Sequence, residues 1–139
     1  MSKKIYFLIV LVAVFGLVLF LMPADRREAY NAMNQAPVVF SPDLSDTVTS
    51  PLIIKGQARG FWYFEGSFPV ELRDSLNNLL AQGIATAQGE WMTEEYVPFT
   101  VELIFVAPNQ GASGTLILVK DNPSGLPEHD ARVEIPVQF

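Results

Sequence analysis

The sequence predicts an all-β domain, an antiparallel β-sandwich of about seven strands, preceded by one N-terminal transmembrane helix. Three observations lead to this prediction. A stretch of eighteen residues without a charge lies near the N-terminus, seven short runs of β-forming residues follow it, and clusters of turn-forming residues separate these runs. In two of the runs apolar and polar residues alternate, which is typical of a strand that buries one face.

The uncharged stretch, Ile5 to Met22, is long enough to cross a membrane. At about 1.5 Å per residue it spans about 27 Å, close to the bilayer core of about 30 Å. A cleaved signal peptide is the alternative, because Lys3 and Lys4 precede the stretch. The stretch is longer than the usual signal core, however, and Met22-Pro23-Ala24 lacks a small residue at the first cleavage-site position. An uncleaved anchor is therefore favoured.

Charges around the predicted span give its orientation. Lys3, Lys4 and the amino terminus precede the span, whereas the four charges of residues 25–28 cancel. Because positive charge stays in the cytoplasm, the rest of the chain is expected outside, on a single-pass protein of the cell membrane. We expect a cytoplasmic N-terminus at residues 1–4, a signal-anchor helix at residues 5–22, a polar tether at residues 23–36 and a β-sandwich domain at residues 37–139.

The exported part of the chain is acidic and contains no cysteine. From Asp25 onward, 7 Lys and Arg residues stand against 15 Asp and Glu residues, a net charge of −8. This charge repels phosphate backbones, so nucleic acid is not an expected partner. The absence of cysteine in the sequence removes disulfides, thiol catalysis and cysteine-type metal sites. The domain must therefore be stabilised by burial alone.

Seven runs are predicted to be strands: Val38–Phe40, Leu52–Arg59, Ser67–Arg73, Leu79–Ala87, Val97–Val106, Thr115–Lys120 and Ala131–Gln138. Alternation assigns Phe68, Val70 and Leu72 to the core face of the third run, and Phe99, Val101, Leu103 and Phe105 to that of the fifth. Seven short runs in about a hundred residues, with turn residues between them, indicate an immunoglobulin-like antiparallel β-sandwich.

If the strands alternate in direction, the second, fourth and sixth connections lie at one end of the sandwich: Gly60–Gly66, Gln88–Tyr96 and Asp121–Asp130. This end would hold both tryptophans, the single histidine and seven acidic residues, which are Glu65, Glu90, Glu94, Glu95, Asp121, Glu128 and Asp130. Aromatic and polar groups together are typical of a binding surface. We expect it to consist of Phe61, Tyr63, Glu65, Trp91, Glu94, Glu95, Asp121 and His129.

Five aromatic residues lie within eight positions of the stretch Ala58–Leu72. If the period of two continues from the second predicted strand, Trp62 and Phe64 face the core, and Phe61 and Tyr63 face outward, unless the preceding glycine breaks the register. One interpretation is that most of these rings plug the core, since large aromatic side chains dominate protein interiors. The other is that Phe61 and Tyr63 contact a sugar or a protein.

We expect neither an enzyme nor a resident cofactor. Ser67 and Ser124 come near His129 in this arrangement, but neither lies in a Gly-x-Ser-x-Gly elbow. One histidine without cysteines does not make a zinc site of the usual kind. The acidic loop Asp121–Asp130 lacks the regular spacing of an EF-hand, so bound calcium stays a distant alternative.

Three segments resemble the immunoglobulin-like domain of bacterial spore germination, the type associated with GerMN domains. They are ARGFWYFEGSFPVEL at residues 58–72, GIATAQGEWM at residues 83–92 and KDNPSGLPEHDARVEIPV at residues 120–137. The resemblance covers about residues 37–139. It implies an immunoglobulin-like β-sandwich outside the membrane that serves envelope proteins as a non-catalytic accessory or interaction module.

The expected function is therefore that of a membrane-anchored, extracytoplasmic binding or adhesion module. It would act through protein–protein contacts in the cell envelope, as an accessory of spore-germination or sporulation-type systems. The expected partner is an envelope protein, and the chain contacts the membrane through its own anchor. A module that binds cell-wall glycan is the alternative, and a calcium-assisted adhesion domain is a more distant one.

Overall fold

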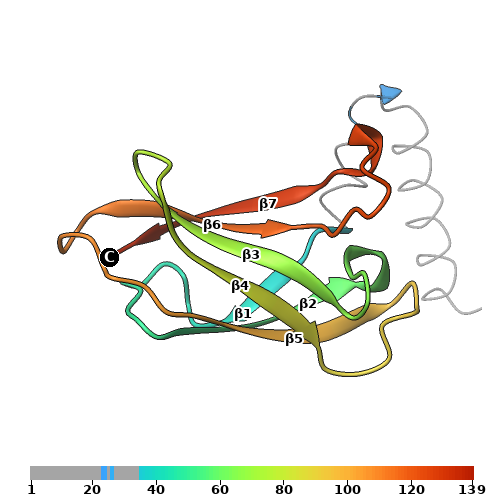
Figure 1. Cartoon of the computed structure of the whole chain (residues 1–139), viewed down its shortest axis with the longest axis horizontal. Helices are drawn as coiled ribbons and strands as arrows, with labels where there is room; N and C mark the ends of the chain where they lie inside the picture. The colour runs from blue at the N-terminus through green and yellow to red at the C-terminus, as the bar shows by residue number, and fades with distance from the viewer. Residues whose placement is uncertain (1–22, 25, 27–34) are drawn as a thin grey trace, which may run out of the picture. The chain divides into compact units, whose positions relative to one another are not determined.

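The computed structural model describes residues 23, 24, 26 and 35–139 of the chain. The predicted cytoplasmic N-terminus, the predicted anchor and most of the predicted tether lie outside these residues. Within the described part, no helix is both long enough and apolar enough to span a bilayer. Residues 36–139 form one compact unit, shown in Figure 1.

All seven predicted runs form strands. The strands are β1 (Val38–Ser41), β2 (Leu52–Arg59), β3 (Ser67–Asp74), β4 (Leu79–Ala87), β5 (Tyr96–Leu103), β6 (Ser113–Val119) and β7 (Arg132–Gln138), and two short 3₁₀ helices are η1 (Gly60–Trp62) and η2 (Pro127–His129). The largest difference from the prediction is at the end of β5, which was expected to reach Val106. The backbone N–H of Phe105 donates instead to Ser50 Oγ, at 3.0 Å, outside the strand ladder.

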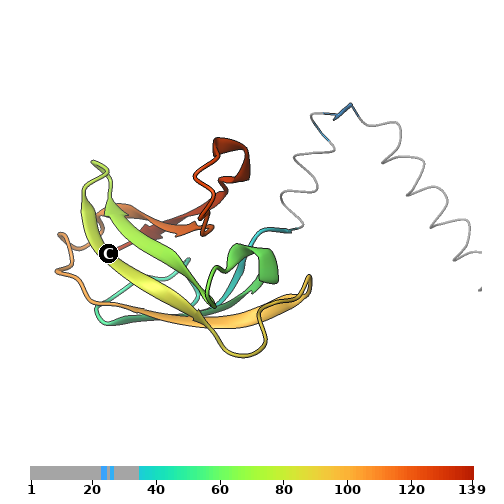
Figure 2. The same ribbon diagram turned by 45° about the vertical axis from the view of Figure 1, so that its right-hand side comes forward.

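The strands form an antiparallel sheet in the order β1-β2-β5-β4-β3-β6-β7. Strand β4 connects two layers: it pairs with β3 along nearly its whole length, but with β5 only at Thr86 and Ala87. One layer is β1-β2-β5 and the other is β3-β6-β7, and Figure 2 shows the separation between them. The predicted immunoglobulin-like sandwich is therefore confirmed, with β4 shared between its layers.

The core lies between these two layers. Strand β2 alternates strictly between buried and more exposed residues. The predicted core residues of β3 and β5 are all buried, and Leu116 and Leu118 of β6 are buried beside those of β3 in the same layer. Phe105 is also buried, although it follows the end of β5, because its ring packs against that of Phe139 at 5.7 Å between centroids. The predicted inward faces are thus confirmed.

Both edges of the sheet are protected against pairing with another chain. Strand β1 has only four residues, a register shift between Val39 and Ser41, and prolines directly before and after it. Strand β7 contains Pro136, and its end is covered where the backbone N–H of Val48 donates to the carbonyl of Gln138 at 2.7 Å. Short length, bulges and prolines are the usual devices that prevent edge-to-edge aggregation.

Consecutive strands run in opposite directions throughout the sheet, because every pairing is antiparallel. The β2–β3, β4–β5 and β6–β7 connections consequently lie at one end of the domain, on the right in Figure 1. Strand β1 begins at this same end, since Val38 pairs with Gln57 near the end of β2. The predicted gathering of the three unusual segments is confirmed.

Candidate functional site

We call the three connections at this end the loop end: the β2–β3 loop (residues 60–66), the β4–β5 loop (residues 88–95) and the β6–β7 loop (residues 120–131). The β2–β3 loop begins with η1 and finishes in a tight hairpin turn. Phe64 and Ser67 exchange two backbone hydrogen bonds, at 3.0 and 3.1 Å, across Glu65 and Gly66, whose φ angles are 51° and 77°. Two positive φ angles identify a type I′ turn, for which glycine is favoured.

Two of the four aromatic side chains at residues 61–64 do not take the predicted orientation, because η1 interrupts the strand period. Trp62 is 3% exposed and Phe61 is 44% exposed, as predicted. Tyr63, however, is only 4% exposed, and Phe64 is 42% exposed, so the expected orientation of these two was wrong. A 3₁₀ helix turns its side chains by about 120° per residue, not the 180° of a strand. Trp62 and Tyr63 therefore both point inward, and Phe64 leaves the core.

Tyr63 is part of the core and not of the exposed surface. Its Oη donates a hydrogen bond to the carbonyl of Val97 at 2.7 Å, and its ring lies 5.1 Å from that of Phe68 in an edge-to-face arrangement. Burial raises the pKa of the Tyr63 phenol to about 12. The side chain fixes the β2–β3 loop to the start of β5.

We expect Tyr63→Phe to reduce the free energy of unfolding by about 1 kcal/mol at neutral pH, because the Val97 carbonyl loses a buried partner. The raised pKa also makes stability depend on alkaline pH. The Tyr63 phenol ionises near pH 10 in the unfolded chain but only near pH 12 in the folded chain. Its contribution to the free energy of unfolding is therefore complete below pH 10 and is lost as the pH rises toward 12. Urea denaturation across pH 8 to 12 should show a shallower alkaline decline for Tyr63→Phe, and equal declines would contradict this role.

The β4–β5 loop packs directly on the β2–β3 loop. The backbone N–H of Gly60 donates to the carbonyl of Glu95 at 3.1 Å. A Cβ atom on Gly60 would lie 1.8 Å from the carbonyl oxygen of Thr93 and 2.4 Å from that of Trp91. The Trp91 ring reaches to 3.3 Å from the position of a Cβ on Gly66. Glycine is thus required at Gly60 by the close approach of a second backbone.

Arg59 connects the same two loops at their base. Its Nη1 donates to the carbonyl of Glu94 at 3.1 Å and lies 3.6 Å from the Glu95 carboxylate. Its guanidinium carbon is 4.2 Å from the centre of the Tyr96 ring, which is within the range of a cation–π contact. Tyr96 Oη in turn donates to the carbonyl of Ala36 at 3.3 Å. The start of the domain is thereby held beside the loop end.

The β6–β7 loop joins the β2–β3 loop from the other side. The backbone N–H of Asp121 donates to the carbonyl of Trp62 at 3.1 Å. Lys120 Nζ donates to the carbonyl of His129 at 2.9 Å and lies 5.8 Å from the centre of the Phe61 ring. Asn122 Nδ2 donates to Asp130 Oδ1 at 2.7 Å within the loop. The three loops therefore form one connected block, with the β2–β3 loop in its middle.

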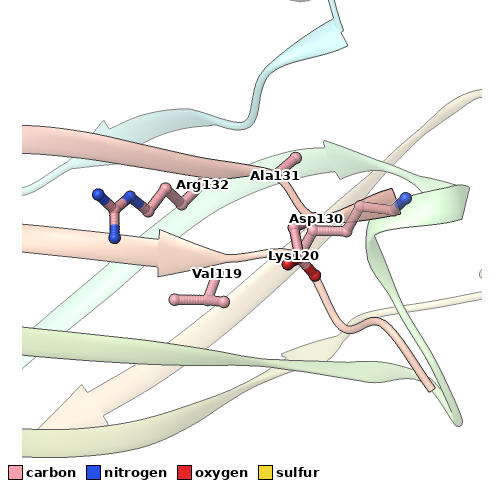
Figure 3. A pocket seen from close by; sticks show the side chains of 5 residues that line it. All are labelled: Val119, Lys120, Asp130, Ala131 and Arg132. Atoms are coloured by element: carbon pink, nitrogen blue, oxygen red, sulfur yellow. The ribbon is translucent and has the colours of Figure 1, made fainter. Parts of the chain in front are cut away.

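A shallow depression of about 490 Å³ lies where β6 and β7 enter this block. Val119, Lys120, Asp130, Ala131 and Arg132 line it. Figure 3 shows that the side chains of Lys120 and Arg132 extend in opposite directions, Lys120 toward the β2–β3 loop. The Nε atom of Arg132 forms an ion pair with Oε1 of Glu134 at 3.0 Å. The depression therefore has no set of converging polar groups.

The surface of the loop end combines apolar and acidic side chains. Phe61, Phe64, Met92 and Leu126, which we call the apolar patch, are 44%, 42%, 73% and 48% exposed. Of the predicted site residues, Phe61, Glu65, Glu94, Glu95 and His129 are exposed, Asp121 and Trp91 are half-buried, and Tyr63 is buried. The prediction placed all eight residues on this surface, whereas the structure places seven of them there and Tyr63 in the core.

Sequence reasoning missed three members of the apolar patch. Phe64 was assigned to the core, and Met92 and Leu126 were not considered. A signal for the last two was present, because each is a large apolar side chain inside a loop of polar and turn-forming residues, outside any strand period. Across residues 35–139 the structure brings together no group of three or more acidic, histidine or cysteine side chains that could hold a metal ion.

Comparison with known proteins gives one family. No curated protein and no solved structure matches the chain significantly. A family model does match, over residues 38–125, from the first residue of β1 into the β6–β7 loop. This match covers more than half of the chain and includes six of the seven strands. The chain belongs to the Gmad2 family, the immunoglobulin-like domain of bacterial spore germination.

Proposed function

We propose that this protein is a membrane-anchored, extracytoplasmic binding module that makes protein–protein contacts in the cell envelope through its loop end. The observation that carries this proposal is the apolar patch, formed by side chains from three separate loops. Aromatic residues and methionine are enriched in protein interfaces, where a polar rim surrounds an apolar centre. The three loops of the loop end carry seven acidic residues together with these exposed apolar side chains.

Rigidity of the loops supports binding. Backbone groups carry the contacts between loops, from Gly60 to Glu95 and from Asp121 to Trp62. A surface that is already ordered loses little conformational entropy when a partner docks, which favours affinity. Docking of a partner would remove these exposed apolar side chains from water, which favours binding.

Binding is proposed in place of catalysis because the polar side chains do not converge. Ser67 Oγ donates to the carbonyl of Phe64 at 3.4 Å, and Ser124 Oγ donates to Asn122 Oδ1 at 2.5 Å. Neither hydroxyl is bonded to His129, which is exposed in η2. A nucleophile and its base must lie within hydrogen-bond reach, and these residues do not meet that requirement.

The proposed location follows from the uncharged stretch at residues 5–22 and from where the domain begins. Ala36 is bonded to Tyr96 beside the loop end, so the chain that leads to the anchor leaves the domain there. A partner that docks on the loop end would therefore also lie near the point where the chain leaves the domain. An envelope protein with an extracytoplasmic surface is the class of partner that fits both features.

Site-specific photocrosslinking of the full chain in its own cells tests this proposal. A photoreactive residue at Phe61 or Met92 is expected to give protein adducts of defined mass, whereas the same residue at Leu76 is not. Leu76 is the matched control, because it is also an exposed apolar side chain but lies in the β3–β4 turn at the opposite end. Adducts at Leu76 alone, or at no position, would contradict the proposal.

A glycan ligand would give a different pattern. The full chain would then sediment with purified cell wall and lose that binding on Phe61→Ala, while no protein adduct formed at Phe61 or Met92. Phe61 suits this experiment better than Tyr63, whose buried ring contributes to folding. That combination of results would replace the protein partner with a sugar.

A further inference from the structure

The charge around the apolar patch identifies the kind of partner that it fits. Seven acidic residues lie in the loop end: Glu65, Glu90, Glu94, Glu95, Asp121, Glu128 and Asp130. Three basic side chains lie in these loops or directly beside them in sequence, Arg59, Lys120 and Arg132, and each is bonded within the domain. The loop end therefore combines exposed apolar side chains with an excess of acidic over basic residues.

Four of these carboxylates are available to a partner. Within the described part of the chain, four side chains form neither a hydrogen bond nor an ion pair, and these are Glu65, Glu94, Asp121 and Glu128. The other three are engaged: Glu90 accepts from the backbone of Met92, Asp130 from Asn122, and Glu95 lies near Arg59. The free carboxylates come from all three loops, as the apolar patch does.

The exposed rings add a second attraction for cations. Lys120 Nζ lies 5.8 Å from the centre of the Phe61 ring, which is within cation–π range. The Phe61 ring is thus already near one ammonium group of this chain. A lysine or arginine from a partner could contact exposed faces of Phe61 or Phe64 while it pairs with Glu65 beside them.

We infer that the loop end binds a basic protein segment, one in which lysine or arginine residues alternate with large apolar side chains. The apolar patch covers the apolar side chains, and the free carboxylates pair with the cations. Anionic lipid headgroups are repelled by the same charge, and a neutral glycan gains nothing from it. This inference rests on the proposed function and names the chemistry of its partner.

The experiment compares two triple variants of the full chain. Glu65→Gln, Glu94→Gln and Glu128→Gln together remove three exposed charges from the loop end. Asp43→Asn, Asp46→Asn and Glu102→Gln together remove three exposed charges away from the loop end and form the matched control. Both variants change the net charge equally, so any difference between them reports the position of the charge.

The first readout is binding of a labelled probe peptide to the full chain in phosphatidylcholine vesicles. The probe contains lysine, arginine, leucine and phenylalanine separated by glycine, and a matched peptide carries glutamate in place of both basic residues. We expect the loop-end variant to bind the basic probe roughly tenfold more weakly than the wild type, and the control variant to differ by less than about twofold. Raising the salt from about 0.05 to 0.5 M should weaken binding to the wild type, since the Debye length falls from about 14 to about 4 Å.

The second readout repeats crosslinking from Met92 in both variants. Loss of the adduct in the loop-end variant, with retention in the control, supports a basic partner. Equal losses in both variants, or equal binding of the basic and acidic peptides, would overturn the inference. Adducts that persist unchanged in the loop-end variant would also overturn it while leaving the proposed function intact, and a lack of adducts even in the wild type would contradict both.

Discussion

Phe68→Ala is expected to lower the free energy of unfolding by about 4 kcal/mol, the largest effect of any single substitution considered for this domain. The Phe68 side chain is completely buried in β3. Its ring lies 6.1 Å from that of Trp62 and 5.1 Å from those of Tyr63 and Phe99, each in an edge-to-face arrangement. The substitution removes three aromatic contacts and leaves a cavity between the layers.

Phe64→Ala is the matched control for this experiment. It removes the same atoms four positions earlier in the sequence, but Phe64 is exposed in the type I′ turn, so we expect a loss below about 1 kcal/mol. Urea denaturation of the full chain in mild detergent, followed by the fluorescence of Trp62 and Trp91, measures both changes. Similar losses for the two variants would show that Phe64 contributes to the core after all.

Gly60→Ala is expected to cost about 3 kcal/mol although it adds a single methyl group. The new Cβ would meet two backbone carbonyl oxygens of the β4–β5 loop, those of Thr93 and Trp91. A backbone cannot rotate away as a flexible side chain can, so the loop must move and the hydrogen bond from Gly60 to Glu95 is lost. The packing of the β4–β5 loop on the β2–β3 loop would be broken with it.

Gly125→Ala separates this steric effect from the general effect of replacing a glycine. No atom lies within 4 Å of a Cβ at Gly125, and its φ of 65° gives only a conformational cost of about 1 kcal/mol. Denaturation of both variants, together with crosslinking at Met92, provides the measurement. If Gly60→Ala proves as mild as Gly125→Ala and keeps the crosslink, the two loops do not depend on this contact.

Most of the fold could be predicted from the sequence because the strands are marked locally. Phe68, Val70 and Leu72 alternate with polar or half-buried neighbours, and turn-forming residues bound each strand. The position of the loop end followed from the seven strands together with the assumption that consecutive strands alternate in direction, which the antiparallel pairings bear out. The shared pairing of β4 could not be predicted in this way, because it depends on contacts between segments distant in sequence.

The candidate site was harder to predict than the strands. A period of two assigned Phe64 to the core and Tyr63 to the surface, and both assignments were wrong because η1 interrupts the strand. The requirement for glycine at the start of η1 is tertiary: the β4–β5 loop approaches Gly60 so closely that no side chain fits. Local sequence shows the glycine but not the backbone that lies against it. The partner remains a prediction that the experiments above test, and the anchor remains a prediction that lies outside the described residues.

The bond between Tyr96 and Ala36 has a mechanical consequence. The chain toward the predicted anchor leaves the domain beside the loop end, where the proposed partner also docks. A pulling force between membrane and partner would then enter and leave the domain at the same end. It would load β1 and the interloop hydrogen bonds and leave the interior of the sandwich unstretched. Under tension, the four-residue strand β1 would detach before the layers separate.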